Sequence, residues 1–141
     1  MARPFPLAGL LRLRRLQEDE AASALAAANR TAALHAGRQQ AARHELDATS
    51  SEATGATALL AVAAARASAR SMLATLDALT AEHNAAAAQA HESYLQARLQ
   101  ASGMEKLEAR HHAAARGEVL RAEQIGLDEL AGRGRKIGGQ H

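Results

Sequence analysis

The 141-residue chain contains no cysteine, no tryptophan, one phenylalanine and one tyrosine. Without cysteine it can form neither a disulfide bond nor a thiolate metal site, as is common for proteins of the cytoplasm. With two aromatic side chains, a large packed core or an aromatic-lined ligand pocket is not expected. These absences argue against a compact enzyme.

Proline is also nearly absent, because it occurs only at Pro4 and Pro6. From Leu7 onward nothing in the chain forbids a helix. Alanine supplies 39 residues and leucine 19. Alanine is the strongest helix former, yet it has only one methyl group to bury. We therefore expect long helices that pack weakly against each other.

Apolar and small residues recur at steps of three and four in two long segments, which predicts two helices. The first spans residues 6–49 and its stripe includes Leu7, Leu10, Leu11, Arg14, Glu18, Ala21, Leu25, Ala28, Ala32, His35, Ala42 and Leu46. Short polar residues and Gly55 predict a turn over 50–56. The second helix spans 57–131, and its stripe includes Leu59, Val62, Ala69, Leu73, Leu76, His83, Ala87, Ala90, Tyr94, Ala97, Ala101 and Met104. A glycine-rich basic tail, 132–141, is expected to be flexible.

The predicted fold is all-α: one domain over residues 1–141, an elongated two-helix antiparallel coiled-coil hairpin with a longer C-terminal helix. A single uninterrupted helix is the alternative. A turn near residue 53 makes the numbers of paired residues add up to about 105, so that Leu7 lies opposite Leu99. Residues 104–131 then have no partner in the chain. They either project alone or bend back at Gly103 or Gly117.

The sequence shows no arrangement typical of catalysis, cofactor binding or metal binding. The seven histidines lack the i, i+3 or i, i+4 spacing of metal ligands. No secretory signal is expected, because arginines interrupt the apolar segment that begins at Phe5. No membrane span is expected either, because no stretch approaches the roughly 18–20 apolar residues that a span needs. Residues 1–17 and 132–141 are basic and contain no acid. No aromatics interleave with the arginines and acids dilute the central face, so nucleic-acid binding is a weak alternative.

Both ends of the chain resemble a known family. Residues 5–22 place leucines and arginines before Glu18 and small residues, and residues 123–133 read Glu-Gln-Ile-Gly-Leu-Asp-Glu-Leu-Ala-Gly-Arg. Together they resemble the flagellar export protein FliJ, over nearly the whole chain. This resemblance implies a non-enzymatic, cytoplasmic coiled-coil stalk, peripheral at the inner face of the cell membrane at the flagellar base, with a role in motility and chemotaxis.

The resemblance also implies partners: the hexameric flagellar export ATPase, the cytoplasmic domain of the export gate, and export chaperones. The implied gate contacts are Met72, Leu76, Leu79 and His83. The implied ATPase contacts are Leu7, Leu10, Leu11, Arg12, Arg14, Arg15, Leu127, Asp128, Leu130, Arg133 and Arg135. The facing residues Ala42, Glu45 and Thr49 are smaller or more polar than the family pattern, which implies a weaker or relocated gate contact.

Each set also has a simpler interpretation. The gate residues would pack only on the first helix, and the ATPase residues would form a solvated face. For the whole chain, the alternative functions are a structural coiled-coil scaffold, or a general chaperone without an ATPase partner.

Overall fold

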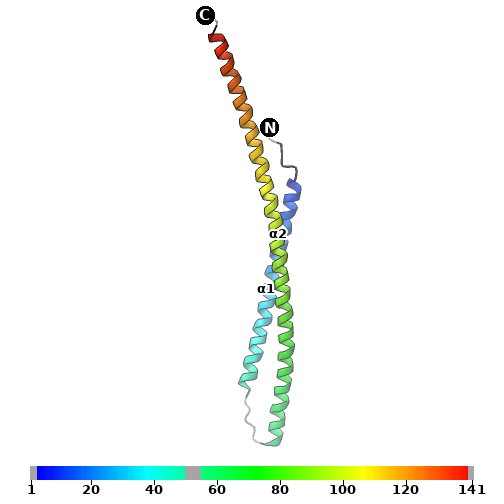
Figure 1. The fold of residues 1–141 in the computed structure, drawn as a ribbon. Coiled ribbons are helices and arrows are strands. Elements are labelled where there is room, and N and C mark those ends of the chain that lie inside the picture. The colour runs from blue at the N-terminus through cyan, green and yellow to red at the C-terminus, as the bar shows by residue number, and fades with distance from the viewer. Residues whose placement is uncertain (1–2, 50–54, 140–141) are drawn as a thin grey trace. The chain divides into compact units, whose positions relative to one another are not determined.

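The computed structural model describes residues 3–49 and 55–139, and these residues form two long α-helices (Figure 1). Helix α1 spans Ala8–Ala48 and helix α2 spans Ala56–Gly138. No strand occurs in these two described ranges. The two helices pack against each other, which confirms the predicted all-α hairpin with a longer second helix.

Helix α1 begins just after the two prolines. The backbone N–H of Ala8 donates to the carbonyl of Phe5 at 3.1 Å, and that of Leu11 donates to Leu7 at 2.9 Å. Pro4 and Pro6 have no N–H to offer, and ahead of the helix they leave no hydrogen bond missing. The observed bounds differ from the predicted 6–49 by one or two residues. Most of the predicted turn, residues 50–54, lies outside the described residues.

Helix α2 continues to Gly138, so the predicted helix end at Ala131 is wrong. Glycine in a helix costs about 1 kcal/mol relative to alanine, which weakens a helix without ending it. Between the glycines stand strong helix formers, and Arg135 and Lys136 lie in the last turn. Their positive charges interact favourably with the negative end of the helix dipole. Residues 132–138 are therefore helical rather than a flexible tail.

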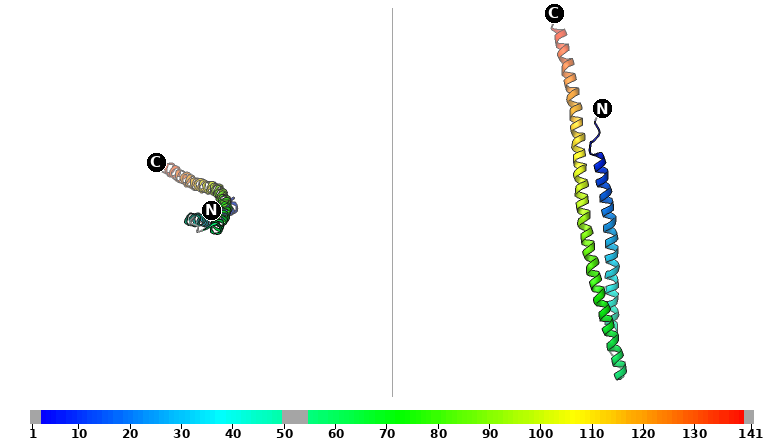
Figure 2. Two further views of the ribbon diagram at one scale, coloured as in Figure 1. Left: turned by 90° about the horizontal axis from the view of Figure 1, so that it is seen from below. Right: turned by 90° about the vertical axis from the view of Figure 1, so that its right-hand side faces the viewer.

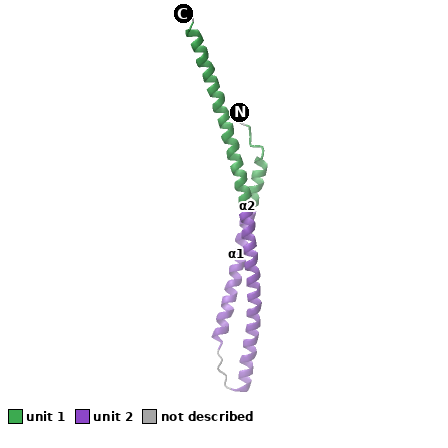
Figure 3. Cartoon of the chain, viewed as in Figure 1, with its two compact units in different colours: residues 1–17, 98–141 green, residues 18–97 purple. Residues whose placement is uncertain are grey.

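The chain divides into two compact units, which are coloured in Figure 3. Unit 2 comprises residues 18–97, and unit 1 comprises residues 1–17 and 98–141. In unit 2 the less exposed side chains follow a strict heptad spacing of alternate three- and four-residue steps. They are Glu18, Ala21, Leu25, Ala28, Ala32, His35, Gln39, Ala42 and Leu46 on α1, and Val62, Arg66, Ala69, Leu73, Leu76, Thr80, His83, Ala87, Ala90, Tyr94 and Ala97 on α2. We call these two stripes the seam.

Contacts across the seam show that the predicted register is wrong. The residue numbers of contacting pairs add up to 115 for His35 and Thr80, to 116 for Gln39 and Asp77, and to 120 for Arg43 and Asp77. The prediction took the middle of the polar segment as the centre of the turn. Side-chain packing instead sets the register, and the first turns of α2 extend past the end of α1.

Unit 1 has its own small core, formed by Phe5, Leu11 and Met104 with Ala8 packed against them. Ala101 is also buried. Leu99, the predicted partner of Leu7, is instead 73% exposed. The same shift in register explains this error, because it moves the partners of the first α1 residues further along α2. Met104 is thus paired, although the sequence predicts that the unpaired part of α2 begins there.

Helix α2 contains an 18-residue window that by length and hydropathy could cross a membrane, and none of this window is buried. The expectation that no stretch approaches the length and hydropathy of a membrane span is therefore wrong. The apolar first part of α2, which includes Leu59 and Leu60, is followed by Arg66 and Arg70. An arginine at the centre of a membrane helix costs roughly 2.5–3.5 kcal/mol. Length and composition alone are weak evidence for a span.

Candidate protein-binding surfaces

The last part of α2, residues 113–138, extends beyond the start of α1 (Figures 1 and 2). The contacts nearest to it are made by His111, whose ring lies 5.6 Å from that of Phe5 and whose Nε2 lies 2.9 Å from the Arg3 carbonyl oxygen. Helix α2 is continuous through Gly103 and Gly117. Of the two alternatives, the structure shows the projecting one, with the unpaired segment beginning after His112. We call residues 113–138 the C-terminal extension.

The C-terminal extension carries an exposed apolar stripe: Leu120, Leu127, Leu130 and Ile137 are each more than 60% exposed. Their spacing of seven, three and seven residues places them on one side of the helix. The heptad positions of the α1-facing side continue instead through Glu118, Ala122, Ile125 and Glu129. At about 100° per residue, the two stripes lie roughly 150° apart. A partner that covers the leucines must approach from a direction other than that of α1.

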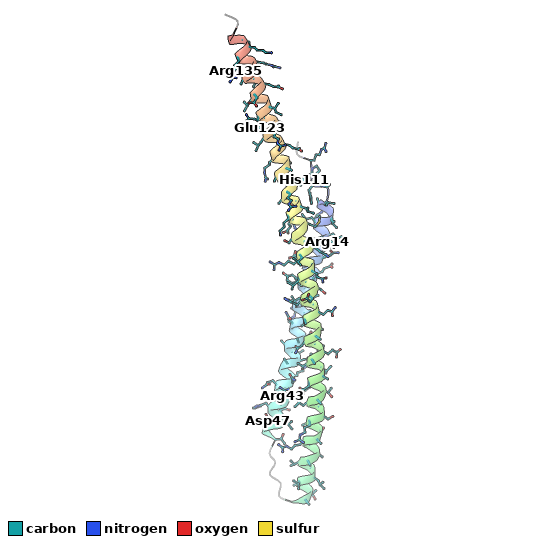
Figure 4. All side chains as sticks on the ribbon, viewed as in Figure 1. Arg14, Arg43, Asp47, His111, Glu123 and Arg135 are labelled. Carbon is teal, nitrogen blue, oxygen red and sulfur yellow. The ribbon has the colours of Figure 1, made fainter. Side chains whose placement is uncertain are left out.

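Shallow grooves run along this stripe. One is lined by His112, Ala115, Arg116, Val119, Leu120 and Glu123, and the next by Glu123, Gly126, Leu127 and Leu130. Figure 4 labels Glu123 and Arg135 on this part of the helix. Asp128 accepts a hydrogen bond from Gln124 Nε2 at 3.2 Å, and Arg133 and Arg135 are exposed. The surface thus combines apolar anchors with a charged rim.

Of the six predicted ATPase residues near the N-terminus, three contact other residues of unit 1 and three are exposed. Leu11 is only 2% exposed and belongs to the core of unit 1. Arg14 donates to Gln17 at 3.0 Å and to Gln100 at 2.9 Å, and Arg15 forms an ion pair with Glu105 at 3.3 Å. The remaining three, Leu7, Leu10 and Arg12, are exposed.

The predicted gate residues differ in how exposed they are. Met72 is 63% exposed and lines a groove with Ser68, Ser71, Thr75 and Leu76. Leu76 and His83 are seam positions facing α1, while Leu79 lies at the edge of the seam and is half-buried. His83 stacks on His35 with ring centroids 4.1 Å apart. Packing on α1 therefore engages His83, and Met72 is the member most accessible to a partner.

Sequence reasoning missed a polar cluster across the middle of unit 2. Gln39 Nε2 donates to an oxygen of Asp77, Arg43 pairs with the same oxygen at 3.4 Å, and Thr80 Oγ1 donates to the His35 carbonyl at 3.4 Å. Figure 4 labels Arg43 on α1. The sequence contained one sign of polar contacts at this place, because His35 and His83 both lie on stripes of mainly apolar and small residues. Without the register, their pairing could not be recognised.

None of these sites has the geometry of a reaction centre. In the part of the chain that the structure describes, no three His, Cys, Asp or Glu residues are grouped to hold a metal ion. The grooves lie along the sides of helices. Exposed apolar stripes on a helical surface are suited to binding another protein.

Two antiparallel helices joined along a heptad seam, with a further unpaired apolar stripe, define a coiled-coil interaction protein. The family model described as flagellar FliJ protein matches residues 3–135. The chain belongs to the FliJ family, and is thus a component of the flagellar protein export apparatus. Neither the curated proteins nor the solved structures gave a match.

Proposed function

We propose that this chain is a non-enzymatic stalk that couples the hexameric flagellar export ATPase to the cytoplasmic domain of the export gate. It works in the cytoplasm at the inner face of the cell membrane, at the flagellar base, and reaches the membrane through protein partners. In the same place it assists export chaperones. Membership of the FliJ family supports this role.

The observation that carries the proposal is the C-terminal extension. Leu127 and Leu130 are 61% and 64% exposed, on a part of the helix that has no partner among residues 3–49 and 55–139. Burying a leucine side chain is worth about 1.5–3 kcal/mol, so a partner that covers this stripe gains substantial free energy. Arg133 and Arg135 follow the leucines and can pair with acidic groups at the rim. We assign this surface to the ATPase.

The ATPase surface also includes the exposed residues at the start of α1. Leu7, Leu10 and Arg12 belong to unit 1, as does the C-terminal extension. Both predicted groups of ATPase residues are therefore in one compact unit. In this proposal Leu11, Arg14 and Arg15 support the surface by holding α1 on α2.

The gate contact is assigned to the exposed groove around Met72 in unit 2. Met72 supplies a flexible apolar side chain, which adapts well to a partner surface. Leu76 lines the same groove while packing on α1. Leu79 adds its exposed part, and His83 contributes through its place in the seam. The two partners then bind different compact units.

The proposal is tested by charging one surface at a time. Leu127→Asp with Leu130→Asp places two carboxylates where apolar contacts are expected, and should abolish stimulation of ATPase ring assembly and ATP turnover. It should leave binding to the cytoplasmic domain of the gate unchanged in a pull-down assay. Met72→Asp should show the reverse pattern.

A matched control places the same two charges on the other side of the helix, at Ala114 and Ala122, which are both exposed. This Ala114→Asp, Ala122→Asp variant should stimulate the ATPase as the wild type does. Circular dichroism confirms that all variants remain helical. Unchanged ATP turnover with the double leucine variant contradicts the proposal.

A further inference from the structure

Two histidines face each other across the seam of unit 2. The rings of His35 on α1 and His83 on α2 are nearly parallel, with an interplanar angle of 16° and a centroid separation of 4.1 Å. His35 Nδ1 is buried and has no hydrogen-bond partner among the described residues. This geometry suits two neutral imidazoles, because stacked cations repel each other and a buried charge loses its hydration.

We propose that the stacked His35–His83 pair is a proton-sensitive latch, which holds the two helices together while both rings are neutral and loosens them when a ring is protonated. The pair occupies one layer of the seam. The heptad spacing puts Ala32 and Ala87 in the next layer on one side, and Gln39 and Thr80 in the next layer on the other. Alanine layers bury little surface, so they stabilise the helix pair only weakly. The stacked rings therefore make a large part of the local contact.

The charged groups around the pair are of both signs: the cation Arg38 favours the neutral form of His35, whereas a carboxylate favours the protonated form. On α1, Arg38 lies one turn beyond His35, and Arg43 lies further along. On α2, Asp77 is already engaged by Gln39 and Arg43, and Glu82, next to His83, is exposed. Partial burial, and then the charges of His83 and Arg38, lower the pKa of His35 below its ordinary value of 6.5.

The direction of the pH effect follows from proton linkage. Since the folded state has the lower pKa, the unfolded chain binds more protons in the range just below pH 6.5. The stabilisation by the neutral pair is complete above pH 6.5. It is lost progressively as the pH falls from 6.5 towards the pKa of the folded state. Acidification therefore loosens unit 2.

Among the described residues, the other histidines do not stack across the seam. His111 and His112 are neighbours on α2, and their rings meet edge-on at 5.7 Å. They do not link the two helices to each other. His44 and His91 are exposed. Of the histidines that the structure describes, only His35 and His83 stack on each other between α1 and α2.

The test compares thermal unfolding of the full chain, followed by circular dichroism, at pH 7.5 and pH 5.5. Wild type should unfold at a lower temperature at pH 5.5. The double variant His35→Gln, His83→Gln should lose much less in its unfolding midpoint between the two pH values. The control variant His44→Gln, His91→Gln removes two exposed histidines and should retain the full wild-type shift.

An equal shift in all three proteins would overturn the proposal, because carboxylates elsewhere would then account for it. If the His35→Gln, His83→Gln variant does not fold, an NMR titration of the wild-type chain tests the proposal instead. The pKa of the His35 ring should lie below its ordinary value of 6.5. A pKa of the His35 ring at or above 6.5 would also overturn the proposal.

Discussion

At the scale of single residues, eight of the 20 seam positions are alanines, so the large and polar side chains between them determine where the helices hold together. Leu11 is only 2% exposed and contacts the small core of unit 1. Arg15 and Glu105 form an ion pair, but each side chain is about half exposed. Such surface pairs contribute roughly 0–1 kcal/mol. Apolar burial at Leu11 outweighs the ion pair.

Leu11→Ala is expected to loosen unit 1 markedly. Replacing a buried leucine by alanine costs roughly 2–5 kcal/mol, and this small core places the cost near the lower end of that range. Hydrogen exchange of the amides in residues 98–112 should accelerate. Leu13, on the same turn, is 47% exposed, so Leu13→Ala should have little effect. Equal acceleration in both variants would show that Leu11 is not the main contact.

The residue scale also changes the interpretation of the histidines. From sequence, His83 is a candidate contact for the export gate, and the structure places it in the seam against His35. The two roles compete for the same side chain. Because the ring is already covered on one face by His35, a partner could contact only what remains accessible. Met72 has no such restriction.

At the scale of the helices, the heptad repeat accounts for the pairing of α1 and α2 in unit 2. The spacing predicted both stripes, with His35 and His83 among their members. Glu18, Gln39, Thr80 and Arg66 also occupy the repeat, and their polarity obscures the stripe in the sequence. In an alanine-rich seam one apolar layer resembles the next, so polar layers such as Gln39 with Asp77 can select one register.

Helix α1 contains one glycine whose replacement should stabilise it. Nothing lies within 4 Å of a methyl group placed on Gly37, so Gly37→Ala adds no clash. It should stabilise the helix by about 0.5–1 kcal/mol, because alanine loses less backbone entropy on folding. A raised midpoint in urea unfolding measures the gain.

Gly55 provides the contrasting control. Its φ of 156° is one that residues with a side chain rarely adopt. It also precedes α2, where its carbonyl accepts the first bond from Leu59 at 2.9 Å. Gly55→Ala should therefore lower the urea midpoint. If both variants shifted in the same direction, helix propensity and backbone strain could not be their causes.

At the scale of the whole molecule, the unequal lengths of the two helices separate folding from binding. Residues 113–138 contribute no buried large side chain, whereas residues 98–112 include Met104 and the His111 contacts. The extension therefore adds exposed surface with little internal packing. A segment of this kind is available to a partner without first disrupting the hairpin.

Truncation after His112 should leave the thermal midpoint of the remaining chain nearly unchanged, and should abolish stimulation of the export ATPase. Truncation after Ala97 removes the α2 side of unit 1, and should also release residues 3–17 from their packing. Proteolysis of that N-terminal segment distinguishes the two truncations. If truncation after His112 lowered the thermal midpoint as much as truncation after Ala97 does, the extension would have a structural role.

The sequence by itself determined the all-α class, the two helices and most members of both stripes, although Gln39, Arg66 and Thr80 were missed. These features depend on local properties: helix propensity, the absence of proline and a repeat of three and four residues. The family resemblance was also present in the sequence, at both ends of the chain. The end of α2 was misjudged because glycine weakens a helix by an amount that flanking arginines and strong helix formers can offset.

Only the tertiary structure decided the register. Pairing depends on which layers of two alanine-rich helices meet, and the sequence contains many nearly equivalent layers. That choice moved Met104 into a core, placed His35 on His83 and shortened the unpaired part of α2 to residues 113–138. The exposed leucines of the extension and the histidine pair of the seam both follow from it.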